Sequence, residues 1–215
     1  MRTPSIFACA RAALVLVAGA LTQRSASQTA APNWPQLTTE LRPAESFAGI
    51  SDTQIRSIAV FEEAGKVLQH PRCMNCHPAG DIPLQGDDSH LHQMSPRRGV
   101  DGKGVYAMKC SNCHQPTNTA GLHTPPGNPK WHLPPADMKM VFEGRSAHQL
   151  AKQIMDPKQN GHKNKSQLIA HASDTLVTGA WNPGEGRTLP PMTHDEFKKA
   201  WVTWIQKGGY APKSK

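Results

Sequence analysis

Two copies of a five-residue pattern constrain this chain of 215 residues more than any other feature. The first runs from Cys73 to His77 (CMNCH) and the second from Cys110 to His114 (CSNCH). Two thiols three positions apart lie on one side of a helical turn, where they can add to the two vinyl groups of one porphyrin. The histidine that follows can then bind the iron. The pattern is the attachment signal of c-type haem, so we expect two covalently attached haems c. The expected cofactor-binding residues are Cys73, Cys76, Cys110 and Cys113, with His77 and His114 as proximal iron ligands.

The first 27 residues have the layout of a secretory signal peptide. Arg2 gives a positive start, residues 6–21 are mostly apolar and small, and residues 25–27 offer small side chains for cleavage. The uninterrupted apolar run at 12–21 is only ten residues long. A membrane span needs about 20. We therefore expect cleavage, export to the periplasm and no stable insertion in the membrane.

The cysteine count separates haem from its main alternative. Of the five cysteines, Cys9 lies in the expected signal peptide, and the other four all belong to the two motifs. Four thiolates could instead bind zinc. However, the two pairs start 37 residues apart, against about 15–20 in the commonest zinc sites of this kind. Each pair also carries a trailing histidine, so haem is the preferred interpretation.

The charge of the chain is modestly basic. The formal net charge is +8, and removal of Arg2, Arg11 and Arg24 with the signal peptide lowers it to +5. A surface of this kind can steer an acidic partner, but it does not indicate nucleic acid binding. Because two haems are expected, the expected partners are redox proteins. The charge gives no reason to add a nucleic acid.

Composition and spacing together predict a single domain. Only 37% of the chain is hydrophobic, and it contains 19 prolines and 17 glycines, so two buried porphyrins would supply apolar bulk that the side chains lack. A separation of 37 residues is too short for an independent domain around each haem. We expect an extended segment at 28–44, one dihaem domain at 45–210 and a basic tail at 211–215.

The helical signals predict a mainly α fold with long loops rich in proline and glycine. Possible capping boxes precede three apolar periodic segments, and no segment alternates convincingly as a strand. The expected helices begin at the boxes Ser51/Gln54, Ser146/Gln149 and Thr193/Glu196, and two more are expected over 165–177 and over a short stretch from Val105 through the second motif.

The second axial ligand of each iron is less constrained, because nine histidines remain besides the two in the motifs. His92 lies in the loop between the motifs, His132 lies in a stiff apolar segment, and His171 lies on the inward face of an expected helix. Met138 is a thioether candidate, which would raise the reduction potential relative to a second imidazole. Each could equally be an ordinary core or surface residue, and the pairing of ligands with motifs stays open.

The two motifs resemble those of dihaem c-type cytochromes, and their short separation is similar to that in small periplasmic electron carriers whose haems share one core. A looser resemblance covers most of residues 60–205. The segments 63–66, 72–88, 131–133 and 181–184 are similar to bacterial cytochromes labelled isoquinoline 1-oxidoreductase subunits. That resemblance implies electron transfer from a dehydrogenase of the molybdenum hydroxylase type. It also matches the family's histidines to His90, His92, His132 and His171, and its methionine to Met138.

We therefore expect a cytochrome c-like, periplasmic carrier that relays single electrons between a dehydrogenase and a downstream acceptor and is not itself an enzyme. A peroxidase-like haem enzyme with one open or weakly ligated iron is the alternative, although no paired carboxylates support it. A fixed cytochrome subunit of a larger oxidoreductase complex would carry the same motifs.

Overall fold

The computed structural model describes residues 41–214, all of which belong to one compact unit. The signal peptide expected at 1–27 lies outside the described residues, as do most of the segment expected at 28–44 and the last residue of the tail. Among the described residues, no helix is both long enough and apolar enough to cross a membrane. The helices are α1 (Thr53–Leu68), α2 (Pro71–Met74), α3 (Ala147–Met155), α4 (Lys165–His171), α5 (Thr175–Thr178) and α6 (His194–Gln206), with 3-10 turns at Ala44–Phe47, Cys110–Asn112 and Gly179–Trp181.

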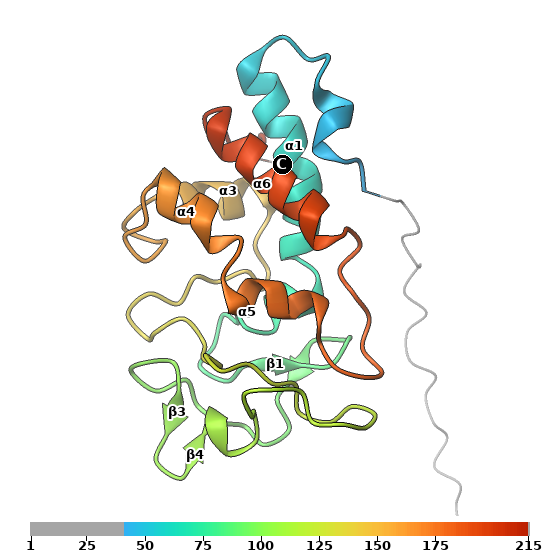
Figure 1. Ribbon diagram of the computed structural model, residues 1–215. Coiled ribbons are helices and arrows are strands. Elements are labelled where there is room, and N and C mark those ends of the chain that lie inside the picture. The colour runs from blue at the N-terminus through green and yellow to red at the C-terminus, as the bar shows by residue number, and fades with distance from the viewer. Residues whose placement is uncertain (1–40, 215) are drawn as a thin grey trace, which may run out of the picture. The chain divides into compact units, whose positions relative to one another are not determined.

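Helices α1 and α6 form the centre of the hydrophobic core (Figure 1). The rings of Phe61 in α1 and Trp204 in α6 lie 4.2 Å apart between centroids, and both side chains are fully buried. Helix α3 packs against α1, and α4 packs against α6. The Trp201 indole N–H donates to the Leu168 carbonyl at 2.8 Å, which ties α6 to α4. Cys73 packs against this core, so the first motif lies at its edge.

Two short hairpins occupy the part of the chain between α2 and the loop after the second motif. Strands β1 (Leu84–Gln85) and β2 (His90–Leu91) pair antiparallel, as do β3 (Gly104–Val105) and β4 (Met108–Lys109). The short helix expected from Val105 into the second motif is therefore wrong. The backbone turns back at Tyr106 (φ 47°), and Gly104 has φ 86°, neither of which a helix permits.

Two of the three expected capping boxes are confirmed, at the start of α3 and of α6. The box at Ser51 is wrong, because α1 begins one residue later and the Asp52 carboxylate accepts from the Ile55 N–H at 2.8 Å. The expected helix over 165–177 is interrupted. Helix α4 ends at His171, and the side chain of Asp174 accepts from the Leu176 N–H and starts α5.

Candidate haem-binding sites

The first motif sits on the last turn of α2. Pro71 occupies the first turn, and the His70 side chain accepts the Arg72 N–H at its start. Beyond Cys73 the chain continues to turn, with the Cys76 N–H donating to the Cys73 carbonyl at 3.2 Å and the His77 N–H to the Met74 carbonyl at 2.9 Å. Cys73 and Cys76 therefore lie within one continuous helical turn, as the motif requires.

The second motif makes the same local coil without a longer helix around it. It starts as a 3-10 turn at Cys110–Asn112, and the His114 N–H donates to the Cys110 carbonyl at 2.9 Å. All four cysteines of this part of the chain are free thiols. Burial raises the pKa of Cys73 to about 12 and that of Cys76 to about 11. Charge on Cys110 also raises the pKa of Cys76, so the two motifs lie near one another.

The imidazole of His77 is held in one tautomer and one orientation. Its Nδ1 lies 2.7 Å from the Met140 carbonyl oxygen. A carbonyl can only accept, so Nδ1 carries the proton and Nε2 keeps a free lone pair. The ring stacks on Phe142 with 3.9 Å between centroids and 11° between planes. Burial lowers the pKa of His77 to about 4, against the opposing effect of the Met140 bond, so the ring is neutral at pH 7.

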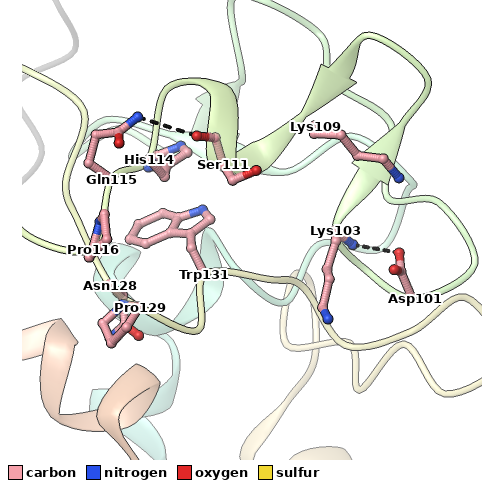
Figure 2. Close-up of a pocket in the computed structure, with 10 residues that line it drawn as sticks. All are labelled: Asp101, Lys103, Lys109, Ser111, His114, Gln115, Pro116, Asn128, Pro129 and Trp131. Carbon is pink, nitrogen blue, oxygen red and sulfur yellow. Dashed lines mark hydrogen bonds between the residues drawn. The ribbon is translucent and has the colours of Figure 1, made fainter.

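His114 has the same environment, built from a different loop. Its Nδ1 donates to the Pro126 carbonyl at 2.7 Å, and its ring stacks on Trp131 at 3.9 Å and 7°. Burial lowers its pKa as well. Figure 2 shows the two stacked rings at the edge of a cavity of about 390 Å³, across from Lys103 and Lys109.

These two histidines are distinguished by a combination of features. His148 also has its Nδ1 2.7 Å from a carbonyl, that of Pro212, so this bond alone identifies nothing. At His77 and His114 the bond occurs together with a preceding pair of thiols and a parallel aromatic ring. Histidines that bind metals generally donate their second N–H to a carbonyl or carboxylate, which fixes the tautomer and raises the basicity of the ligating nitrogen.

The ring of His92 lies beside that of His114. The ring centroids of His92 and His114 are 6.3 Å apart, with 69° between planes. With metal–nitrogen bonds of about 2.0 Å and ring nitrogens about 1.1 Å from each ring centre, two axial imidazoles place their centres about 6 Å apart. The observed centroid distance agrees with that spacing. The Met94 N–H approaches His92 Nδ1 at 3.3 Å. Binding through Nε2 would place a proton on Nδ1 and end that contact.

Two further histidine candidates are His171, which lies on the side of the first motif, and His132, which directly follows the Trp131 that stacks on His114. His171 ends α4, and Leu168 and Ile169 of this helix belong to the same apolar cluster as Cys73. Its charge lowers the pKa of His77, and charge on His132 lowers the pKa of His171. His171 also lines an open cavity of about 440 Å³. The Nδ1 of His132 lies 2.5 Å from the Lys130 carbonyl, which leaves its Nε2 free.

The remaining two candidates have weaker positions. His90 Nδ1 contacts a carboxylate oxygen of Asp88 at 2.6 Å, and its side chain is 41% exposed. Met138 is half-buried just after the turn at Pro135, and its role as a ligand stays a prediction.

No family model, curated protein or solved structure matches this chain. Within residues 41–214, no three or more His, Cys, Asp or Glu side chains gather as a group that could hold a metal ion. An iron in haem takes at most two axial ligands from the protein, so neither expected site requires such a group.

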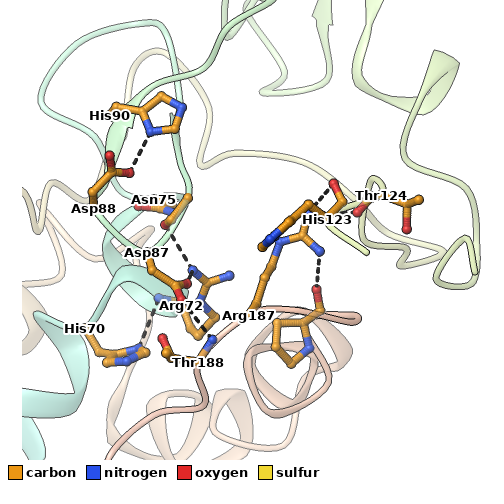
Figure 3. Close-up of polar contacts among 12 residues, drawn as sticks. His70, Arg72, Asn75, Asp87, Asp88, His90, His123, Thr124, Arg187 and Thr188 are labelled. Atoms are coloured by element: carbon orange, nitrogen blue, oxygen red, sulfur yellow. Dashed lines mark hydrogen bonds and ion pairs between the residues drawn. The ribbon is translucent and has the colours of Figure 1, made fainter. Parts of the chain in front are cut away.

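A polar network joins the first motif to distant loops (Figure 3). The Arg72 side chain is 6% exposed; it pairs with Asp87 and donates to the Gly86 carbonyl at 3.0 Å. The second Asp87 oxygen accepts from the Thr188 N–H at 3.1 Å. Arg187, the next residue back, donates to the Thr124 carbonyl at 2.8 Å. The network therefore connects the start of α2 to the loop at residues 86–87, to residues 187–188 and to Thr124.

Several site residues could not be identified from the sequence. Phe142 and Trp131 stack on the two histidines, and the carbonyls of Met140 and Pro126 orient them, yet these groups lie up to 65 residues from their partners. Every residue has a backbone carbonyl, so the sequence does not indicate which carbonyl binds a histidine. Phe142 and Trp131 could have been noticed only because they are aromatic.

Proposed function

We propose that this protein is a dihaem cytochrome c that carries single electrons, with one haem attached at Cys73/Cys76 and the other at Cys110/Cys113. The observation that carries the proposal is the repeated geometry of the two histidines. Each follows a coil with two thiols and keeps Nε2 free by donating Nδ1–H to a carbonyl. Each is also stacked on an aromatic ring.

When bound, each haem supplies an iron that accepts and releases one electron. The thiols of the two motifs would hold the porphyrins, and the neutral Nε2 atoms of His77 and His114 would be the proximal iron ligands. The carbonyl bonds and the stacked rings hold both imidazoles in one orientation, so ligation costs little reorganisation. His92 would serve as the second histidine ligand of the haem at the second motif, and His171 would serve as that of the haem at the first.

The closeness of the two motifs supports a relay in which both haems share one domain. Export by the N-terminal signal peptide would place the protein in the periplasm, where it would receive electrons from a dehydrogenase, such as one of the molybdenum hydroxylase type, and pass them to a downstream acceptor. A peroxidase-like enzyme would need an iron with a free coordination position. The 6.3 Å separation of His92 and His114 favours an iron with two histidine ligands at the second motif.

Mass spectrometry of protein exported from cells that attach haem c tests the proposal. The wild type is expected to carry two covalent haems, and the double variants C73A/C76A and C110A/C113A are expected to carry one each. C9A is the matched control and is expected to keep both, because Cys9 lies in the expected signal peptide. Two covalent haems in either double variant, or none in the wild type, would contradict the proposal.

A further inference from the structure

Arg98 lies between the two motifs in the sequence and is almost completely buried, with a relative exposure of 1%. Its guanidinium donates to three carbonyls: that of Pro134 at 2.6 Å, that of Gly80 at 3.0 Å and that of Pro78 at 3.5 Å. Pro78 directly follows His77. The positive charge therefore lies against the backbone that carries the first proximal histidine.

This charge is incompletely neutralised. Within residues 41–214, the carboxylate that pairs with Arg98 is that of Asp81, 3.7 Å from Nε. Asp81 also binds the Lys139 ammonium at 2.8 Å, and its side chain is 48% exposed. Two cations thus share one solvated carboxylate, and the Arg98 Nε has no hydrogen-bond partner in the described chain. The guanidinium stays protonated in such a site, because the pKa of arginine is too high for it to lose its proton.

We propose that Arg98 sets the reduction potential of the haem at the first motif, holding it higher than a neutral residue at position 98 would. The inference rests on the proposed function. Reduction adds one electron to the haem, and a nearby buried positive charge stabilises the reduced form more strongly than a solvated charge does.

The effect should be selective for one haem. The Arg98 guanidinium donates to the carbonyl of Pro78, the residue that follows His77, at 3.5 Å. Among residues 41–214, no hydrogen bond or ion pair joins the Arg98 side chain to a residue of the second motif, where His114 is held by the Pro126 carbonyl and the Trp131 ring. Removing the charge of Arg98 should therefore move the two potentials by different amounts.

Arg98 also holds three loops through its carbonyl contacts, so charge and structure must be separated. R98Q removes the charge and most of the guanidinium N–H donors that bind the three carbonyls. R98K keeps the charge but loses the forked arrangement of those donors. D81N leaves the contacts of Arg98 with the three carbonyls intact and removes a negative charge. K139Q is the matched surface control, because its ammonium is 35% exposed and screened by water.

The experiment is a redox titration of the holoprotein in which the NMR signals of the haem methyl groups report the oxidation state of each haem. The haems are assigned by nuclear Overhauser contacts from each proximal histidine to Phe142 or Trp131. In R98Q the reduction equilibrium constant of the first haem is expected to fall about threefold to tenfold, or about 28 to 59 mV. The second haem should shift by less than half as much. R98K is expected to restore the potential, D81N to raise it, and K139Q to change it by less than R98Q does.

Equal shifts at both haems, an unchanged first haem in R98Q, or a lowered potential in D81N would overturn the inference. If R98Q does not fold, the sign of the D81N shift decides. Covalent haem is measured first by mass spectrometry. Its absence from the wild type would overturn the proposed function and this inference together, whereas two attached haems without the selective shift would overturn the inference alone.

Discussion

Replacement of His92 by alanine should open one of the two irons and leave the other closed. The 6.3 Å between the His92 and His114 ring centroids matches the roughly 6 Å that two axial imidazoles require. Alanine has no atom that reaches the iron, so the haem at the second motif would lose its sixth ligand. The magnitude follows directly: half of the haem should change from low spin to high spin and should bind cyanide, and the first haem should keep its spectrum.

Electron paramagnetic resonance of the oxidised protein measures this fraction. H90A is the matched control, because His90 lies two residues away but its ring contacts Asp88 and its side chain is 41% exposed. H90A should keep both irons low spin. Two low-spin haems in H92A, or the same high-spin fraction in H90A, would refute the assignment of His92.

Three further predictions concern the first haem and the stability of the chain. H171A should convert the first haem to high spin in the same resonance experiment, and H132A should not. D52A should lower the free energy of unfolding by about 1 kcal/mol in urea titrations, because it removes the N-cap of α1, while S51A should leave it unchanged. The pKa of His77 is about 4 in the folded chain against 6.5 when unperturbed, so the unfolded chain binds more protons between these pH values. His77 should therefore account for a loss of about 3 kcal/mol of stability in haem-free protein as the pH falls from 7 to 4, measured by tryptophan fluorescence as the difference between the wild type and H77Q; parallel pH profiles of the two would contradict the burial of His77.

Local signals in the sequence anticipated much of the helical framework. The capping boxes at Ser146 and Thr193 predicted where α3 and α6 begin, because a cap depends on residues only three positions apart. The same reasoning missed the start of α1 by one residue, since Ser51 and Asp52 are both good caps and only the folded backbone selects between them. It also joined α4 to α5, where Asp174 begins a second helix.

The candidate sites divide in the same way. The thiols and proximal histidines follow from the sequence alone, because their chemistry requires residues within one turn. The proposed second ligands do not: His92 is close to His114 only through the loop that β1 and β2 fold back, and His171 approaches the first motif only through the packing of α4.

The sequence by itself determined which atoms could attach two haems, since covalent spacing is local. Only the tertiary structure decided how His77 and His114 are held, because Met140, Phe142 and Pro126 reach them across loops. It also decided that Arg98 is buried beside the first site, since an arginine in a polar loop carries no local sign of burial. Long-range contacts depend on how the whole chain packs.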